Sequence, residues 1–237
     1  LWNFDKLGDS DFDVSTMKVP DKEDIAQAMA KVDYTQLKYD DATGILTTEN
    51  PDIQIELGAI GKGYAIEQAK DVLKRSDASG GMVSAGSSIY VCGTKKDGSR
   101  FRVALRDPRG DENSAIGVLT LSDTTISTSG DYERYFEKDG VRYHHILDPR
   151  TGYPADSGLM QVTIICDDSV IGDALSTACF VLGLDKGMNL AAKYGVNAIF
   201  VDTDKNIWYN NPDVLNYFEF TGKDSGYVLN EYNQARS

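Results

Sequence analysis

The segment from His144 to Gly183 constrains the fold more than any other part of this chain. It begins with the strand-like run HHIL and continues through DPRTGYP, whose Asp, Pro and Gly are typical of tight turns. An apolar strand, QVTIIC, follows, and then DALSTACFVLG, which has the pattern of a packed helix. The order strand, turn, strand, helix predicts a sheet with a helix packed against it.

Strand-like and helix-like segments are interspersed along the chain without the regular alternation of a doubly wound sheet. We therefore predict an α+β fold, a single domain over residues 1–237 with an antiparallel or mixed sheet flanked by helices. The expected strands are TGILTT (43–48), IQIEL (53–57), GMVSAG (81–86), SIYVCG (88–93), FRVALR (101–106), AIGVLTL (115–121), VRYHHIL (141–147), QVTIIC (161–166), NAIFVD (197–202), NIWYN (206–210) and VLNYFEF (214–220). The expected helices are 21–32, 170–183 and 184–195, and a further one follows the glycine-rich start of segment 58–76.

The charge of the chain limits its partners. With 24 Lys and Arg against 37 Asp and Glu, the net charge is −13. This argues against a nucleic-acid surface, which needs clustered cations. A polyanionic ligand would need a local cation, and abundant carboxylates favour a bound Mg²⁺ or Ca²⁺ over a basic patch. A solvated acidic surface accounts for most of these carboxylates.

The three cysteines, Cys92, Cys166 and Cys179, lie in apolar runs without CxxC spacing, so we expect reduced, buried packing residues. No segment reaches the roughly 20 apolar residues of a membrane-spanning helix, and no secretory leader is visible. Because the chain starts on the apolar run LWNF, we expect that the domain lacks its N-terminal part.

Asp173 and Thr177 form the first candidate for a site. They lie four positions apart on an expected helix, hence on one face, and present two neighbouring oxygen atoms. The alternative is that Asp173 caps the helix, and the sequence alone favours the cap. We expect an apolar stripe to pack this helix against the core, made of Ile171, Ala174, Leu175, Ala178, Val181 and Leu182.

The glycine-rich segment LGAIGKGYA is a second candidate, because strand, glycine loop and helix occur in the order used to bind phosphate. Gly58, Gly61 and Gly63 give GxxGxG, which is not the dinucleotide fingerprint, and Lys62 is not followed by the Ser or Thr of a Walker loop. A tight turn in which glycine permits close packing is the alternative. The phosphate signal is therefore weak on spacing alone.

His144 and His145 are the two histidines of the chain. If HHIL is a strand, their rings point to opposite faces, so at most one reaches a site. That imidazole would be suited to accept a proton from an attacking hydroxyl. The turn that follows would place Asp148 beside it.

Four motifs, HHILDPRTGYP, DALSTACFVLG, LGAIGKGYA and SGDYERYF, together resemble the ApbE-type family of FAD:protein FMN transferases, formerly described as thiamine-biosynthesis lipoproteins. The resemblance implies a Mg²⁺-dependent enzyme that cleaves FAD, attaches FMN through a phosphodiester to a Thr or Ser of an acceptor protein, and releases AMP. Two alternatives stay open: a Mg²⁺-dependent pyrophosphatase that hydrolyses FAD to FMN and AMP, and a non-catalytic flavin-binding protein.

The resemblance also assigns roles to residues. It implies metal ligands at Asp173, at Thr177 and at the backbone carbonyl of Ala59, and it implies that His145 is the catalytic base. The contacts to FAD that it implies fall at Glu56, Lys62, Leu147 and Asp148.

Ser87 departs from the family pattern, because relatives usually have a glycine there. The resemblance further implies a location outside the cytoplasm with a lipid anchor to the membrane, FAD and an acceptor protein as partners, and no nucleic acid. A homo-oligomer is left open.

Overall fold

The computed structural model describes residues 1–9 and 11–233, which form two compact units. Unit 1 comprises residues 1–57 and 134–155, and unit 2 comprises residues 58–133 and 156–237 as far as they are described. The helices are α1 (Lys22–Met29), α2 (Gly61–Lys74), α3 (Ser169–Leu182) and α4 (Leu184–Lys193), with short 3-10 helices at Phe4–Gly8, Val14–Thr16, Tyr34–Gln36, Pro212–Asn216 and Gly222–Ser225. The strands are β1 (Leu37–Asp40), β2 (Ile45–Thr48), β3 (Gly80–Ala85), β4 (Ser88–Gly93), β5 (Phe101–Arg106), β6 (Ala115–Leu121), β7 (Thr124–Gly130), β8 (Tyr135–Lys138), β9 (Val141–His144), β10 (Leu159–Cys166), β11 (Asn197–Asp202), β12 (Asn206–Tyr209), β13 (Phe218–Phe220) and β14 (Val228–Glu231).

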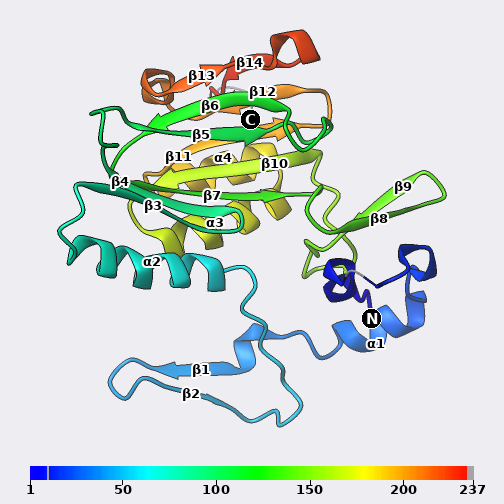
Figure 1. Cartoon of the computed structure of the whole chain (residues 1–237). Coiled ribbons are helices and arrows are strands. Elements are labelled where there is room, and N and C mark those ends of the chain that lie inside the picture. Colours follow the sequence, from blue (N-terminus) through cyan, green and yellow to red (C-terminus); the bar gives the residue numbers. More distant parts are fainter. Residues whose placement is uncertain (10, 234–237) are drawn as a thin grey trace. The chain divides into compact units, whose positions relative to one another are not determined.

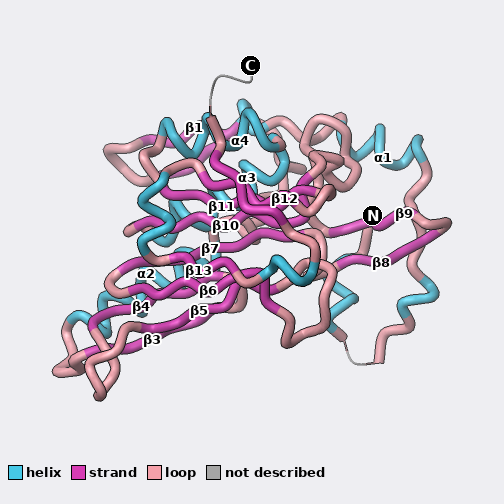
Figure 2. Tube along the Cα trace, turned by 90° about the horizontal axis from the view of Figure 1, so that it is seen from above, coloured by secondary structure: helices cyan, strands magenta, loops and turns pink. Residues whose placement is uncertain are grey.

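Unit 2 is built on a seven-stranded sheet of order β14-β12-β11-β10-β7-β4-β3 (Figure 1). Neighbouring strands are antiparallel except β12 and β14, which are parallel. A second, three-stranded sheet has the order β13-β6-β5. Figure 2 shows α3 and α4 on one side of the larger sheet and β5 and β6 on the other. Unit 2 is therefore a layered α+β structure, and the predicted fold class is confirmed.

The main core lies between the two sheets of unit 2. Alternate residues of the larger sheet point into it, since successive side chains of a strand face opposite sides. The aliphatic core residues from β4, β7, β10, β11 and β12 meet those from β5 and β6: Val91, Ile126, Ile165, Ile199, Val201, Ile207, Val103, Leu105, Ile116, Leu119 and Leu121. Burial of this apolar surface is the main stabilisation of the unit.

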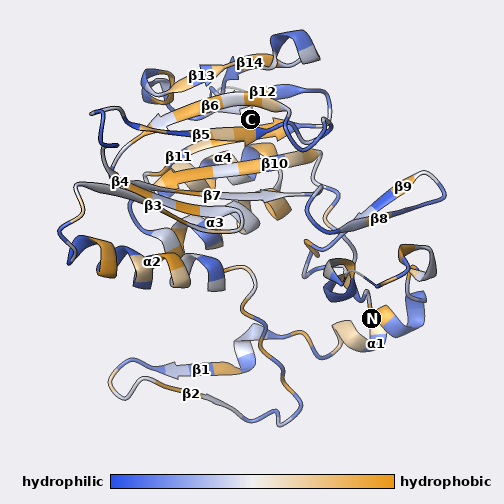
Figure 3. Cartoon of the chain, in the orientation of Figure 1, coloured by the Kyte–Doolittle hydropathy of each residue, from blue (hydrophilic) through white to orange (hydrophobic). Residues whose placement is uncertain are grey.

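The helix-facing side of the larger sheet is more polar at its centre than the core side. In β7, Ser127 and Ser129 point toward α3, and Figure 3 shows β7 pale between more hydrophobic neighbours. Gly172 lets α3 approach this face, because a Cβ there would lie 3.1 Å from Cys166 Sγ. The contact between α3 and the sheet is thus made by small and hydroxyl side chains.

Unit 1 holds a small aromatic core. Trp2 stacks on Phe4 at 5.6 Å, and Phe136 of the β8–β9 hairpin stacks on Tyr143 at 5.2 Å, both measured between ring centroids. Trp2 Nε1 donates to the carbonyl of Gly152 at 2.8 Å, which ties the start of the chain to the DPRTG turn. The β1–β2 hairpin belongs to the same unit, and its residues are largely exposed.

Most predicted elements are confirmed, with four kinds of difference. IQIEL is not a strand: it pairs with none of the described strands, and two of its three apolar side chains, Ile55 and Leu57, are exposed. The expected strand 141–147 ends at His144, and of the expected strand 214–220 only the last three residues are extended. The sequence pattern also does not predict β1, β7, β8 or β14. In β7 the reason is composition, since TTISTSG contains one aliphatic residue.

The buried face of α3 differs from the predicted apolar stripe. Ile171 and Leu182 are each 36% exposed. The residues buried on α3 are Ser169, Gly172, Asp173, Leu175, Ser176, Cys179 and Phe180. Close packing on both the sheet and α2 selects small and hydrogen-bonded side chains over large aliphatic ones.

The predictions about the cysteines, a membrane-spanning helix and the number of domains have different outcomes. Cys179 is buried, and burial raises the pKa of its thiol to about 12, whereas Cys92 and Cys166 are only partly buried. All three are free thiols. Among the described residues, no helix is both long and apolar enough to cross a bilayer. The single domain over 1–237 stays a prediction.

The close approach of α2 to α3 predicts different effects for two glycines of α2. At Gly63 a Cβ would collide with the backbone carbonyl of Ser169 and lie 2.7 Å from Asp173 Cβ, whereas at Gly61 it would meet nothing within 4 Å. We expect Gly63→Ala to lower the free energy of unfolding by about 1–3 kcal/mol. Gly61→Ala, the matched control, should leave it unchanged or slightly raise it. Urea denaturation of both variants measures the difference, and equal stabilities would contradict the packing described.

Candidate functional site

Asp173 is a buried carboxylate at the contact between α3 and the start of α2. Its side chain is 1% exposed. The backbone N–H of Gly63 donates to Oδ2 at 2.8 Å, and the hydroxyl of Ser88 donates to Oδ1 at 3.2 Å. The ammonium of Lys62 lies 3.4 Å from Oδ1. Three donors thus offset the cost of burying this charge.

The helix cap that the sequence favours for Asp173 is wrong. The N-cap of α3 is Asp168, whose side chain accepts the N–H groups of Val170 and Ile171. Asp173 lies one turn further on and instead accepts an N–H from the first turn of α2, a helix whose own N-cap residue supplies no side-chain acceptor. Asp173 therefore caps α2 through a tertiary contact.

This contact changes the interpretation of the glycine-rich loop. Gly63 N–H bonds to Asp173, so this first-turn donor is already used within the protein. The close-packing role proposed for these glycines is confirmed at Gly63, where a Cβ would meet Asp173. The first turn of α2 is thus built around a carboxylate.

Lys62 places a positive charge between this carboxylate and the loop before α2. Its Nζ donates to the carbonyl of Gly58 at 3.2 Å and lies near Asp173 Oδ1, while its side chain is 39% exposed. The Lys62 ammonium therefore contacts both a loop carbonyl and the Asp173 carboxylate. This carbonyl belongs to Gly58, the neighbour of Ala59. Metal binding by the backbone carbonyl of Ala59 stays a prediction.

Thr177 belongs to a chain of hydroxyl groups beside Asp173. Its Oγ1 lies 3.0 Å from the Oγ of Ser129 on β7, and Ser129 Oγ lies 2.8 Å from the Oγ of Ser176. Ser176 in turn donates to the backbone carbonyl of Asp173 at 2.8 Å. Asp173 and Thr177 are thus held from the same side of α3, by donors and acceptors on the sheet.

Ser88 and Ser127 are parts of the site that the sequence does not single out. Both are fully buried. The hydroxyl of Ser127 donates a hydrogen bond to Ser88 at 3.3 Å, and the hydroxyl of Ser88 donates one to Asp173. The signal that would find them is a strand whose alternate positions carry hydroxyls, at 125, 127 and 129 in β7. Ser88 directly follows Ser87, the residue that stands where relatives usually have a glycine.

The donor set of this region fits a hard divalent cation. Asp173 supplies a carboxylate, Thr177 a hydroxyl and the loop before α2 a carbonyl, all oxygen ligands of the kind that Mg²⁺ prefers. The Lys62 ammonium already stands where a cation is shared by two of these oxygens. Among residues 1–9 and 11–233, no three His, Cys, Asp or Glu side chains gather into a metal-binding group. A metal here would therefore be held by mixed oxygen donors.

The anchoring of α3 beside α2 depends on a second set of polar contacts. Glu67 of α2 accepts from the backbone N–H and the hydroxyl of Ser169, at 3.2 and 2.7 Å, and Lys70 donates to the carbonyl of Asp167. Lys70 also donates to the Glu67 carboxylate, at 3.3 Å. Although burial opposes it, the hydrogen bonds from Ser169 and Lys70 to this carboxylate lower the pKa of Glu67. The two helix starts are thus fixed against each other one turn away from Asp173.

The two histidines lie in unit 1 and differ in their surroundings. His144 is buried, its Nδ1 accepts the N–H of Ile146 at 3.3 Å, and its Nε2 lies 3.1 Å from the carbonyl of Ala155. A carbonyl only accepts, so Nε2 carries the proton and both ring nitrogens are used in structure. His145 is partly exposed. His144 is therefore a structural residue, and the catalytic role of His145 stays a prediction.

Asp148 and its neighbours form the turn after these histidines. The carboxylate of Asp148 makes a bidentate ion pair with Arg150, with distances of 2.8 Å from Nε and 2.6 Å from Nη2. This pairing lowers the pKa of Asp148. Leu147 bridges to Pro154 and is 37% exposed, and Glu56 lies exposed in an irregular segment. The contacts of these residues to FAD stay predictions, and the Asp148 carboxylate serves the turn.

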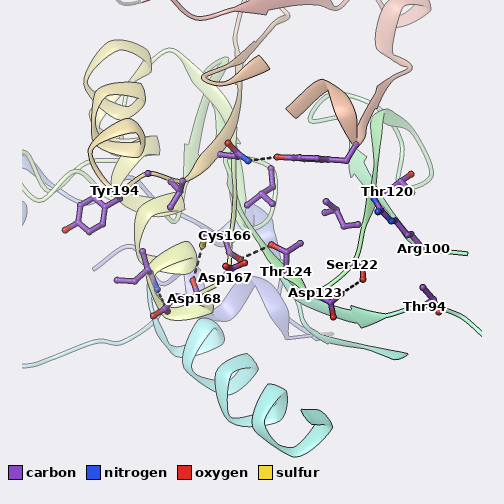
Figure 4. Close-up of a pocket in the computed structure, with 17 residues that line it drawn as sticks. Thr94, Arg100, Thr120, Ser122, Asp123, Thr124, Cys166, Asp167, Asp168 and Tyr194 are labelled. Carbon is purple, nitrogen blue, oxygen red and sulfur yellow. Dashed lines mark hydrogen bonds between the residues drawn. The ribbon is translucent and has the colours of Figure 1, made fainter. Parts of the chain in front are cut away.

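A cavity of about 920 Å³ opens elsewhere in unit 2. It is lined by residues of β6, β7, β10 and the start of α3, and Figure 4 shows how its polar groups are used. Asp123 accepts from Ser122 and from the N–H of Gly93, and Asp168 caps α3. The predicted site residues do not line this cavity.

Comparison with known proteins assigns the family. A family model described as the ApbE family matches residues 1–200. A curated FAD:protein FMN transferase of Klebsiella pneumoniae (strain 342) is 37% identical over 212 residues, which is 89% of this chain and 64% of that protein. One of Treponema pallidum (strain Nichols) is 34% identical over 223 residues, 87% of this chain and 59% of that protein. The chain thus spans about three fifths of the length of these relatives.

Solved structures agree. The crystal structure of the ApbE protein from Thermotoga maritima matches with a TM-score of 0.75 and 37% identity, covering 86% of this chain and 66% of that one. The flavin transferase ApbE from Vibrio cholerae matches with a TM-score of 0.74 and 27% identity, covering 84% and 63%. The chain belongs to the ApbE family.

Proposed function

We propose that this protein is a Mg²⁺-dependent FAD:protein FMN transferase. The observation that supports this most directly is the buried Asp173 carboxylate, which lies one helical turn from the Thr177 hydroxyl. The Lys62 ammonium contacts both this carboxylate and the Gly58 carbonyl of the loop before α2. Membership of the ApbE family and relatives named FAD:protein FMN transferase support the reaction type. FAD and an acceptor protein with a Thr or Ser are the proposed substrates.

Asp173, Thr177 and the loop carbonyl at Ala59 would hold the metal. Bound Mg²⁺ would supply positive charge at the diphosphate of FAD, where negative charge has to be neutralised during transfer. Gly63 N–H and the hydroxyl of Ser88 fix the carboxylate, so Asp173 needs no reorganisation to meet a cation.

Lys62 has to change partners when the metal binds. Its ammonium stands beside the carboxylate that the metal would take, and two positive charges beside one carboxylate repel each other. The side chain is partly exposed and flexible, so it can turn to a phosphate oxygen of FAD. Lys62 would therefore bind the substrate diphosphate only after it has left Asp173.

His145 would act as the general base. The hydroxyl oxygen of the acceptor Thr or Ser attacks the phosphorus on the FMN side, its proton passes to His145, and the bond to the bridging oxygen breaks with release of AMP. His144, with both ring nitrogens engaged in unit 1, keeps the backbone of this segment in place. Leu147 and Glu56 would contact FAD, and Asp148 would do so through backbone groups because Arg150 holds its carboxylate.

The location and the lipid anchor rest on the family resemblance alone. We propose that the complete protein acts outside the cytoplasm, attached to the membrane by a lipid. No contact described above depends on this proposal.

The first prediction from the proposed function tests the reaction and the metal ligand together. Incubation with FAD, Mg²⁺ and an acceptor protein should leave fluorescent flavin on the acceptor in a denaturing gel. Asp173→Asn keeps the shape of the side chain but removes its charge, so labelling should fall by more than about 100-fold. Asp204→Asn, in an exposed turn, is the matched control and should label normally. Free FMN and AMP without label would indicate hydrolysis instead, and unchanged FAD would indicate a binding protein.

A second prediction concerns the base. His145→Gln should lower transfer by roughly 100- to 10,000-fold, because proton abstraction is lost, while FAD binding measured by flavin fluorescence stays intact. His144→Gln should behave differently and lower the melting temperature, since a buried histidine with two hydrogen bonds is disturbed. Normal transfer by the His145 variant would remove it from the mechanism.

The third prediction concerns the competition at Asp173. Without FAD, Lys62→Met should bind Mn²⁺ more tightly than the unaltered chain, by up to roughly 5-fold, because a partly exposed ion pair of modest energy no longer has to be broken. Lys186→Met, on the exposed side of α4, is the control. Calorimetric titration with Mn²⁺ measures the change, and weaker binding by the Lys62 variant would show that Lys62 does not compete with the metal.

A further inference from the structure

The chain of hydroxyls between α3 and β7 has a direction that proton counting determines. Ser176 has one hydroxyl proton, and it donates that proton to the backbone carbonyl of Asp173, which only accepts. In the 2.8 Å contact between Ser129 and Ser176, Ser129 is therefore the donor. Having spent its proton, Ser129 accepts in its 3.0 Å contact with Thr177.

Thr177 is thus the donor at the free end of this chain. A hydroxyl has one proton and two lone pairs. With its proton directed to Ser129, Thr177 Oγ1 keeps both lone pairs for another group. Thr177 is only partly buried, unlike Ser176, which is fully buried.

A second pair of sheet hydroxyls lies beside Asp173, with the hydrogen bonds running toward α3 and not away from it. Ser127 donates to Ser88, and Ser88 donates to Asp173 Oδ1. Ser127 and Ser129 occupy alternate positions of one strand, so both point to the same face of the sheet. β7 therefore contributes one serine to each of the two hydroxyl pairs beside the predicted metal ligands on α3.

We propose that Ser129 is a positioning residue that holds the Thr177 hydroxyl as a hydrogen-bond donor to the sheet and so leaves its lone pairs for the divalent cation. Ser176 sets the direction of these hydrogen bonds because its oxygen accepts from the Ser129 hydroxyl. This inference rests on the proposed function, because it takes Thr177 as a metal ligand. It adds residues of the sheet that act on the metal only through α3.

The role follows from what a cation requires. A metal accepts electron pairs, so a threonine ligand whose proton points at the metal repels it. Outer contacts that orient a ligand typically change metal affinity by about 10- to 100-fold. Ser129 and Ser176 are not ligands in this proposal, and their effect has to pass through Thr177.

The test is a double-mutant cycle in which the affinity for a metal ion is measured and no enzymatic turnover is needed. Mn²⁺ affinity is measured by the electron paramagnetic resonance signal of free Mn²⁺ in the full chain and in Ser129→Ala, Thr177→Val and the double variant. We expect Ser129→Ala to weaken binding by about 10-fold. The double variant should bind no more weakly than Thr177→Val, because Ser129 acts through Thr177. Independent effects that add would overturn the proposal.

Two further variants guard against a general loss of structure. Ser176→Ala suits a helix and should fold well, and it frees the Ser129 proton to turn toward Thr177, so Mn²⁺ binding should weaken by roughly 3-fold within the range of outer-contact effects. Thr128→Val removes a hydroxyl contact to Thr163 on the opposite face of β7 and should leave Mn²⁺ affinity unchanged. Unaltered affinity in both the Ser129 and Ser176 variants would overturn the positioning role.

The outcomes separate this inference from the proposed function. If Thr177→Val weakens Mn²⁺ binding and Ser129→Ala does not, the positioning role is wrong and the metal ligand stands. If neither Thr177→Val nor Asp173→Asn changes Mn²⁺ affinity, the metal site itself is wrong and both proposals fall.

Discussion

The cost of burying a single carboxylate shapes the region on which the proposed chemistry depends. Asp173 is almost completely shielded from water, so its charge has to be met by donors inside the protein. Those donors come from the first turn of α2, from β4 and from Lys62. Hydrogen bonds to a charged group contribute about 1.5–3 kcal/mol each. The position of α2 against α3 and the glycine at 63 follow from the need to bring an N–H to this carboxylate.

A polar interface is the consequence for the layer between α3 and the sheet. A hydrophobic contact there would bury more apolar surface, but it would leave Asp173 and Thr177 without partners. Serines on β4 and β7 replace aliphatic residues at the centre of the sheet and form two hydroxyl chains. The stability of unit 2 is supplied instead by the other face, where aliphatic residues of both sheets pack together.

Unit 1 uses its titratable groups in a similar division of roles. Asp148 is paired with Arg150 and His144 is held at both ring nitrogens, so the turn after β9 is fixed by side chains that the pattern of the sequence also offered as candidates for chemistry. The aromatic core of Trp2, Phe4 and Phe136 supports this turn through the contact of Trp2 with Gly152. His145, next to the buried histidine, is left as the partly exposed imidazole.

The sequence by itself determined the fold class, most of the strands and helices, the family and the pairing of Asp173 with Thr177 on one face of a helix, because these depend on local periodicity and on motifs contiguous in the chain. It was wrong about the apolar stripe of α3 and did not predict β7, since a strand with one aliphatic residue gives no hydrophobic alternation. Only the tertiary structure decided that Asp173 caps α2 and not its own helix, that the Lys62 ammonium contacts both this carboxylate and the Gly58 carbonyl, and that Ser129 meets Thr177. Each of these contacts joins residues from separate elements, and a hydrogen bond depends on distance and direction in space, which spacing along a chain does not encode.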